Sequence, residues 1–250
     1  MSTQAVLVEP SVKRVIIVSF TSITKDFATS QLLHTIFTGK GISEDSGVYH
    51  YRDFDKIPPV TNPEETILIF TGHHGDPRHC SSPKFEGDGW EGSYNPLEVF
   101  EKMKTQLKKW PHRTLFHNCY SAGLRDDMKR GLCYKLLSYL TDSNVLAYCY
   151  LDKAPRFQDT RNKDAFTKTL RGVVIFRWTN GNVLYLHRET MTIGNVIDDL
   201  YNHTEYPEDS FNIVVNVTSL AKPLAKMPPL KQSAAYKRHL GKKRGQKKPK

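Results

Sequence analysis

A histidine and a cysteine of this chain each follow a short apolar segment. His74 comes after residues 66–70 (TILIF), and Cys119 comes after residues 113–116 (RTLF). A cysteine attacks a carbonyl carbon as its thiolate, and a neighbouring histidine can accept the thiol proton. Together these residue types support acyl transfer through a thioester, with Cys119 as the nucleophile and His74 as the general base.

Acyl transfer also needs hydrogen-bond donors for the oxyanion that forms during the reaction. Gly75 has no side chain to cover its backbone N–H, and the N–H of Cys119 is the natural second donor. A helix that began near Ser121 would add the positive end of its dipole, which lowers a thiol pKa. We therefore expect an oxyanion hole built from Gly75 and Cys119.

Other interpretations of these residues have to be weighed. A cysteine at the end of a buried strand is more often a small core residue than a nucleophile, and Cys133 and Cys149 fit that description because they lie inside apolar segments. The histidines at 73–74 could instead bind a metal, but the nearby His79 and Cys80 match no standard zinc spacing. We expect no metal site.

Strands and helices alternate along the part of the chain that would position these residues. Strands are expected at 12–20, 48–54, 66–70, 113–116 and 144–151, and helices at 28–38, from 95 onward and at 124–140. This alternation predicts an α/β fold, a mostly parallel sheet with helices on both faces in an α/β/α sandwich. The carboxyl ends of parallel strands meet at one edge of the sheet, so His74 and Cys119 should lie together there.

Two short segments carry specific sequence signals, one for the start of a helix and one for a hairpin turn. Asn95 and Pro96 suit the cap and first turn of a helix, and Glu98 could close a capping box. Later in the chain, an Asn-Gly pair between residues 173–178 and 183–187 predicts a hairpin. Further elements are expected as helices at 165–170 and 192–201 and a strand at 211–218.

The basic residues are unevenly distributed. Residues 231–250 contain nine of the 36 Lys and Arg and none of the 26 Asp and Glu, so residues 1–230 are within one charge of neutrality. We expect this composition to leave the tail disordered. It would attract nucleic acid or an import receptor, or would only increase solubility. Its main basic residues are Lys237, Arg238, Lys242, Lys243, Arg244, Lys247 and Lys248.

Composition also excludes some classes of protein. No apolar run approaches the roughly 18 residues of a membrane span, and residues 1–10 lack the pattern of a signal peptide. The four cysteines show no Cys-x-x-Cys spacing, so we expect reduced thiols. We expect a cytoplasmic or nuclear protein with no membrane partner, consisting of a short extension (1–11), one domain (12–222) and the basic tail (223–250).

The two motifs together resemble those of the caspase and metacaspase peptidases, with legumain- and gingipain-type enzymes as more distant relatives. In metacaspases the first motif is close to Ser-Gly-His-Gly, and residues 71–75 (TGHHG) match it with one additional His. The second is close to Asp-Ser-Cys-His-Ser-Gly, and residues 117–123 read HNCYSAG. The resemblance covers residues 12–205 and implies a caspase-like fold with Cys119 and His74 in the catalytic roles.

The resemblance also implies cleavage after a specific P1 side chain, but the candidate S1 residues disagree about which one. His117 stands where caspases have Gln and metacaspases have Asp. Arg161 aligns with a caspase arginine and would favour an acidic P1, since Arg pairs with carboxylates, whereas Asp159 would favour a basic one. Calcium activation is conceivable by resemblance alone, and no sequence motif supports a cofactor.

Two departures from the family pattern affect the expected function. Residues 55–65 replace the helix expected before the His74 strand, and residues 141–143 leave little room for an activating cut, so we expect a single-chain protein. The leading hypothesis is a cysteine endopeptidase of protein substrates. The alternative is a catalytically silent caspase-like fold that binds nucleic acid or protein through its tail. A serine α/β-hydrolase is disfavoured, because no Gly-x-Ser-x-Gly occurs. The oligomeric state is left open.

Overall fold

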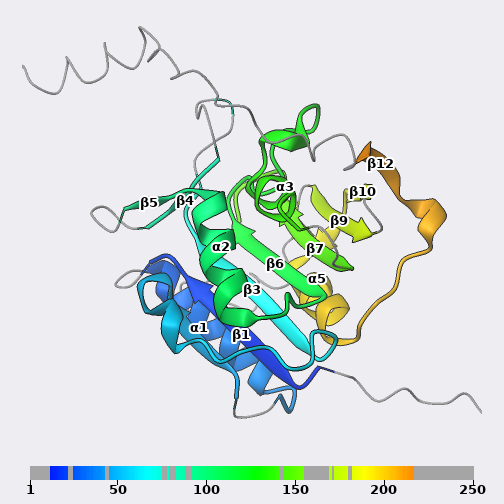
Figure 1. The fold of residues 1–250 in the computed structure, drawn as a ribbon. Coiled ribbons are helices and arrows are strands. Elements are labelled where there is room, and N and C mark those ends of the chain that lie inside the picture. Colours follow the sequence, from blue (N-terminus) through cyan, green and yellow to red (C-terminus); the bar gives the residue numbers. More distant parts are fainter. Residues whose placement is uncertain are drawn as a thin grey trace, which may run out of the picture. The chain divides into compact units, whose positions relative to one another are not determined.

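An eight-stranded sheet forms the centre of the described part of the computed structural model (Figure 1). The strands are β1 (Arg14–Ser19), β2 (Gly47–His50), β3 (Thr66–Gly72), β6 (Arg113–Asn118), β7 (Val145–Tyr150), β9 (Val173–Thr179), β10 (Asn182–Arg188) and β12 (Asn212–Asn216). Their order is β12-β10-β9-β7-β6-β3-β1-β2. Neighbouring strands in the series β2, β1, β3, β6 and β7 pair in parallel. Strands β9, β10 and β12 extend the sheet beyond β7 with antiparallel pairs.

The structure describes residues 12–21, 25–42, 45–74, 78, 83–87, 92–140, 144–154, 169–170, 172–179 and 182–216. Gly75, Asp159, Arg161 and the basic tail lie outside these ranges, so the expectations made for them are not addressed by the structure. The same holds for residues 165–168 of the helix expected at 165–170, whereas Thr169 and Leu170 form a short strand, so the helix was wrong at that end.

The helices of the described residues are α1 (Lys25–Thr38), α2 (Pro96–Leu107), α3 (Leu132–Leu137) and α5 (Ile193–Tyr201), with 3-10 turns η1 (Tyr51–Lys56), η2 (Met128–Arg130) and η3 (Glu208–Ser210). Short strands complete the set: β4 (Phe85–Glu86), β5 (Ser93–Tyr94), β8 (Thr169–Leu170) and β11 (Met191–Thr192). β4 pairs with β5, and β8 pairs with β11.

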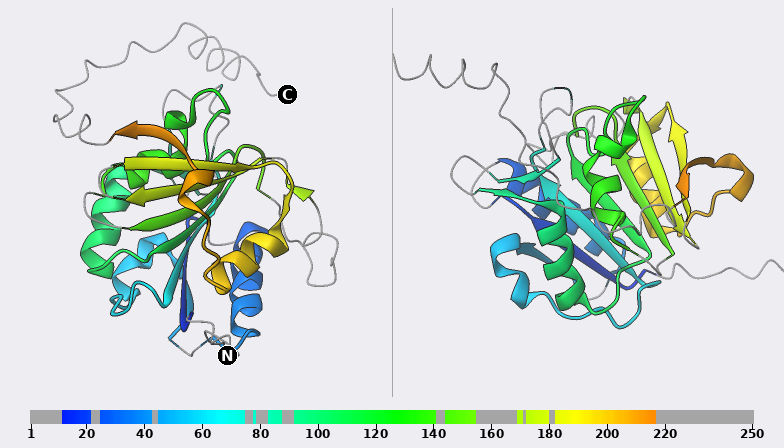
Figure 2. Two further views of the ribbon diagram at one scale, coloured as in Figure 1. Left: turned by 90° about the vertical axis from the view of Figure 1, so that its right-hand side faces the viewer. Right: turned by 45° about the horizontal axis from the view of Figure 1, so that its top comes forward.

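Helices cover both faces of the sheet. Alternate strand residues such as Phe70 and Phe116 share one core with the apolar sides of α2 and α3, whereas Ile69 and Leu115 share the other with α1 and α5. The left view of Figure 2 shows α2 on one side of the sheet and α1 and α5 on the other. The central strands are apolar on both faces because both faces are buried. The predicted α/β/α sandwich is therefore confirmed.

The start of α2 follows the predicted cap in part. Asn95 has extended backbone, its side chain accepts the N–H of Leu97, and Pro96 takes the first helical position. Glu98 does not close a capping box; it pairs with Lys102 one turn later, with 2.9 Å between carboxylate oxygen and ammonium nitrogen. The hairpin of β9 and β10 and helix α5 also form as expected, and α5 begins with a capping box between Thr192 and Asn195.

Two further predicted elements are wrong. The strand expected at 48–54 ends at His50, whose ring nitrogen accepts the N–H of Arg52 at 3.3 Å and starts the turn η1. In place of the helix expected at 124–140, the chain forms the 3-10 turn η2 and then the short helix α3. Leu132 and Leu136, which the helical spacing predicted to be buried, are buried. Gly131 separates the two pieces.

Only a glycine fits at 131. A Cβ at this position would lie 2.5 Å from the carbonyl carbon of Ala122, a contact with backbone that no side-chain rotation relieves. The segment after Cys119 thus doubles back against the start of α3, which explains why one continuous helix cannot form there.

We expect Gly131→Ala to lower the free energy of unfolding by about 2–3 kcal/mol, because the added methyl group overpacks a rigid backbone contact. Urea denaturation followed by far-UV circular dichroism measures the loss. Gly41→Ala is the control: Gly41 has φ +89° but nothing within 4 Å of an added Cβ, so we expect only the left-handed backbone cost of about 1 kcal/mol. Equal losses in the two variants would contradict the proposed contact.

Candidate active site

The structure brings His74 and Cys119 together at the carboxyl edge of two adjacent parallel strands. In the register of β3 and β6, Thr71 lies opposite His117 and Gly72 opposite Asn118. His74 follows β3 and Cys119 follows β6, and the distance from Nδ1 of His74 to the carbonyl oxygen of Cys119 is 2.9 Å. The strand pairing therefore carries both residues to the same place.

This hydrogen bond assigns the nitrogens of the His74 ring. A carbonyl oxygen only accepts, so Nδ1 carries a proton, and in the neutral ring Nε2 is the basic nitrogen. His74 is 6% exposed, while Cys119 is partly exposed. The arrangement holds a buried imidazole beside a thiol-bearing residue that solvent can reach.

The adjacent histidine has a different place. The main chain of His73 bonds to Glu86 of β4 in both directions, each with 3.0 Å between nitrogen and oxygen. This bridge fixes the chain just before His74. It gives His73 a role in positioning His74 through its backbone.

Cys119 lies in a tight turn rather than before a helix. The N–H of Ser121 donates to the carbonyl of Asn118 at 3.3 Å, and Tyr120 between them has φ +52°. Residues 119–127 form turns and bends but no helix, so the expectation of a helix dipole at Ser121 was wrong. The reason is the return of the chain toward Gly131, described above.

The turn is held to the end of β7. The Ser121 hydroxyl donates to the carbonyl of Phe116 at 2.9 Å and accepts the N–H of Tyr150 at 3.1 Å. The N–H of Tyr120 donates to the carbonyl of Asp152 at 2.8 Å. These bonds fix the backbone on both sides of Cys119 and so offset part of the cost of a left-handed tyrosine, about 1–2 kcal/mol.

His117 is buried, with 4% of its surface exposed. Its Nδ1 lies 3.2 Å from the hydroxyl of Tyr150, and the two rings meet edge to face. Burial raises the pKa of Tyr150, so its hydroxyl is neutral at physiological pH. This burial leaves His117 little surface for direct substrate contact.

A hollow of about 520 Å³ opens beside Tyr120 at the same edge of the sheet. Its charged lining comes from segments that follow strands or begin turns: Arg78, Arg125, Asp152 and Glu189. Arg125 and Glu189 pair at 3.5 Å. Sequence reasoning did not single out these residues, although Asp152 and Glu189 both follow strand ends at this edge, which is a signal that could have found them.

Asn118 is a second residue that the sequence reasoning passed over. Its side chain is fully buried, and neither its amide oxygen nor its amide nitrogen has a hydrogen-bond partner among the residues described. A buried amide without a partner costs about 1–3 kcal/mol. This cost falls on the residue immediately before Cys119.

The described residues include no group of three or more His, Cys, Asp or Glu side chains that could hold a metal ion. None of the helices described is long and apolar enough to cross a membrane.

The fold and the paired residues define this molecule as an α/β/α sandwich with a histidine and a cysteine at the carboxyl edge of neighbouring strands. Comparisons with protein-family models, with curated proteins and with solved structures give no match.

We expect Asn118→Leu to raise the free energy of unfolding by about 1 kcal/mol, because it replaces an unsatisfied buried amide with an apolar group of similar size. The measurement is urea denaturation. The control is Asn195→Leu, which removes an amide that caps α5 and should destabilise the protein by about 1 kcal/mol. A larger loss at Asn118 than at Asn195 would show that the Asn118 amide is satisfied and would refute the argument.

Proposed function

We propose that this protein is a cysteine endopeptidase that cleaves protein substrates with a Cys119–His74 dyad. The single observation that carries the proposal is the 2.9 Å contact between Nδ1 of His74 and the Cys119 carbonyl, which makes Nε2 the basic nitrogen. The resemblance of both motifs to caspases and metacaspases supports the same assignment.

In the proposed reaction, Nε2 of His74 accepts the thiol proton, and the Cys119 sulfur forms a bond to the scissile carbonyl carbon. The electron pair of the carbonyl moves to its oxygen, which the N–H groups of Cys119 and Gly75 would stabilise. As the C–N bond breaks, the imidazolium of His74 returns the proton to the leaving amine. Water activated by His74 then hydrolyses the thioester and releases the acid.

The hollow beside Tyr120 is the place where the side chain of the P1 residue would bind. The hollow beside Tyr120 presents both signs of charge through residues such as Arg125 and Asp152, so it supports neither an acidic nor a basic P1 over the other. His117, Asp159 and Arg161 are proposed as S1 residues from the family resemblance. Because His117 is buried, it would influence the P1 side chain through neighbouring residues such as Tyr150 and not by direct contact.

We expect Cys119→Ala to abolish peptidase activity, because the nucleophile is lost. A fluorogenic peptide library scanned at P1 measures activity in the wild type and the variant. Cys149→Ala is the control, since Cys149 is a fully buried thiol whose Sγ donates to the Val174 carbonyl; it should retain activity in any molecules that fold. Cleavage that persists in purified Cys119→Ala would refute the proposal.

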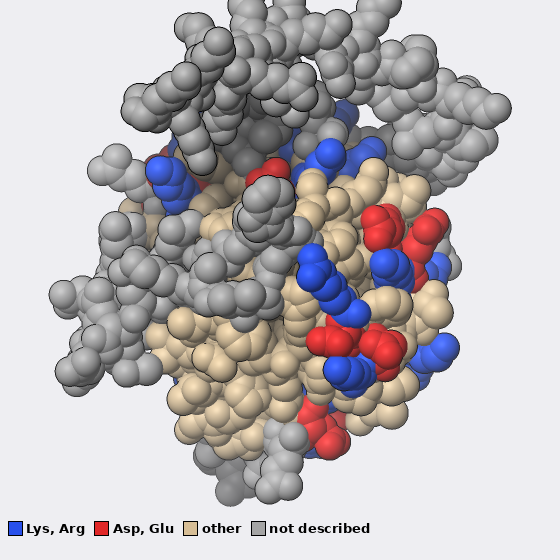
Figure 3. All heavy atoms as spheres, turned by 90° about the vertical axis from the view of Figure 1, so that its left-hand side faces the viewer, with Lys and Arg blue, Asp and Glu red and all other residues tan. Residues whose placement is uncertain are grey.

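A second candidate function rests on the basic tail. Nine of the 36 Lys and Arg lie in residues 231–250 with no acidic residue, while the rest of the chain is nearly neutral. On the face drawn in Figure 3, basic and acidic side chains of the described residues are interspersed. A tail of this charge in a cytoplasmic or nuclear protein would bind nucleic acid or an import receptor.

We expect the full chain to bind single- and double-stranded oligonucleotides with an affinity that falls steeply with salt, because binding releases counterions from phosphates. Fluorescence anisotropy at several salt concentrations measures this dependence. Deleting residues 231–250 should remove the binding, and Cys119→Ala should leave it unchanged. Salt-dependent binding that survives the deletion would exclude the tail as its source.

A further inference from the structure

A second hollow, of about 390 Å³, lies at the amino edge of the sheet, away from His74 and Cys119. It is formed where β6 and β7 begin, where the antiparallel β9 ends, and where the chain leaves α5. Leu146 of β7 pairs with Arg177 of β9 in the ladder, which brings Arg177 to this edge. The proposed peptidase chemistry does not use these residues.

The wall of this hollow is rich in hydrogen-bond donors. Arg113 and Arg177 are both half-buried and line it together with His112 and His203. The Nε–H of Arg113 is buried and has no hydrogen-bond partner among the residues that the structure describes. Arg177 is placed with its guanidinium over the ring of Phe211, 5.4 Å from the ring centre. A buried guanidinium N–H of this kind is costly unless something accepts from it.

His203 lies at this hollow as a half-buried neutral imidazole. Burial, then the charge of Arg113 and then His112, lower the pKa of His203 to about 4, against a weaker opposing effect of Glu65. Its imidazole is therefore neutral at pH 7 and offers one N–H donor. His203 also has φ +52°, a conformation that non-glycine residues rarely adopt. The chain after α5 thus holds this ring at the hollow despite strain.

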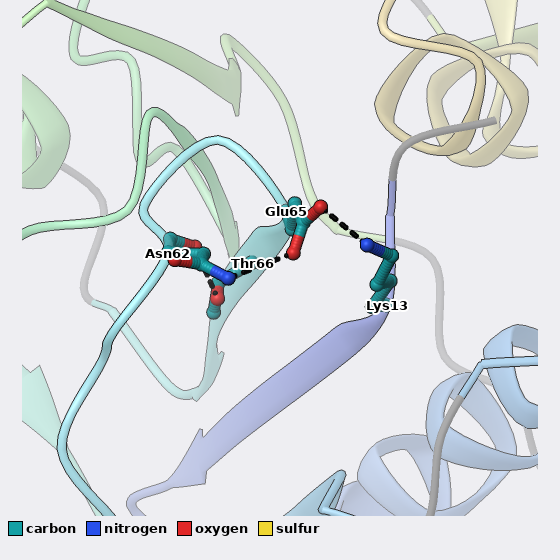
Figure 4. Close-up of polar contacts among 4 residues, drawn as sticks. All are labelled: Lys13, Asn62, Glu65 and Thr66. Carbon is teal, nitrogen blue, oxygen red and sulfur yellow. Dashed lines mark hydrogen bonds and ion pairs between the residues drawn. The ribbon is translucent and has the colours of Figure 1, made fainter. Parts of the chain in front are cut away.

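Three carboxylates, those of Glu64, Glu65 and Glu205, also line this hollow. They differ in their exposure and in the partners they already have. Figure 4 shows Glu65 between Lys13 and Asn62, at 2.6 Å from the ammonium nitrogen and 2.9 Å from the amide nitrogen. Glu64 and Glu205 are exposed, where water screens their charge. Glu205 attracts Arg113 from that position. Of the three carboxylates that line the hollow, Glu65 is thus already paired with Lys13, and Glu64 and Glu205 are exposed.

We propose that this hollow binds the phosphate group of a small phosphorylated ligand, with Arg113 as its principal contact and Arg177 and His203 as further donors. The donors come from three separate segments, namely β6, β9 and the chain after α5. A phosphate offers several acceptor oxygens in a tetrahedral arrangement, whereas a carboxylate offers two in one plane. A volume of about 390 Å³ lies in the usual range for small-molecule sites. The exposed carboxylates of Glu64 and Glu205 would accept hydrogen bonds from hydroxyl groups of the ligand.

Isothermal titration calorimetry of the full chain with inorganic phosphate tests the proposal. We expect Arg113→Gln to weaken binding by at least about tenfold, as expected for a hydrogen bond to a charged group. Arg125→Gln removes the same charge from the opposite edge and should bind phosphate as the wild type does. Equal binding by Arg113→Gln and the wild type would overturn the proposal and would assign any affinity to other basic residues such as the tail.

A second measurement keeps the test decisive if Arg113→Gln does not fold. Phosphate bound beside His203 would stabilise its imidazolium, so NMR titration of the wild-type protein should show the pKa of His203 rise from about 4 when phosphate is present. Arg113→Lys, which retains the charge but loses the guanidinium fork, should reduce this rise. An unchanged His203 titration, or an equal effect of acetate at the same ionic strength, would overturn the proposal.

One further variant tests the phosphate site independently of the proposed peptidase site. Cys119→Ala should retain phosphate binding in full, because Cys119 lies at the opposite edge of the sheet. Loss of phosphate binding in folded Cys119→Ala would contradict a site at the amino edge. Absence of peptidase activity in the wild type would leave the phosphate result unaffected.

Discussion

The pairing of β3 with β6 is the constraint on which the site depends. The two strands are parallel, with Phe70 opposite Phe116 and Gly72 opposite Asn118. The rings of Phe70 and Phe116 lie 5.2 Å apart in the core beneath α2 and α3. A slip of one residue would turn these rings to the opposite face of the sheet and shift the strand ends by about 3.3 Å. Apolar packing on both faces therefore sets the distance between His74 and Cys119.

The same ladder also determines what lies at the other edge. Its first pair joins Ile67 to Arg113, so the register that aligns the carboxyl ends also places a half-buried arginine where β6 begins. Glu65 just before β3 is held by Lys13, which precedes β1. The amino edge is thus organised by backbone pairing and one ion pair, without any contribution from the residues around Cys119. The two proposed sites therefore lie at opposite edges of one sheet, and neither proposal depends on the other.

The sequence is most informative where a single short-range signal decides the structure. The apolar runs before His74 and Cys119 predict buried strands, and the alternation of elements predicts that these strands are neighbours. The cap at Asn95 is equally local. Prediction fails where a distant contact decides: Gly131 breaks a periodic helix because it touches Ala122, and Tyr120 adopts a positive φ without being glycine. The donors of the amino-edge hollow come from separate segments, and no motif joins them.

The three thiols of the described residues differ in their surroundings. Cys133 lies in α3 and Cys149 in β7, both fully buried in regular structure, and burial raises the pKa of Cys133. Burial makes both thiols hard to reach, and the raised pKa makes that of Cys133 hard to ionise. Cys119 is partly exposed, in a turn that contains a left-handed tyrosine. The turn follows Asn118, a buried asparagine whose side chain has no hydrogen-bond partner among the described residues. Strain and unpaired polar groups persist only where surrounding structure maintains them, and they concentrate at functional sites. Of these three thiols, Cys119 is therefore the one that solvent reaches, as its proposed role requires.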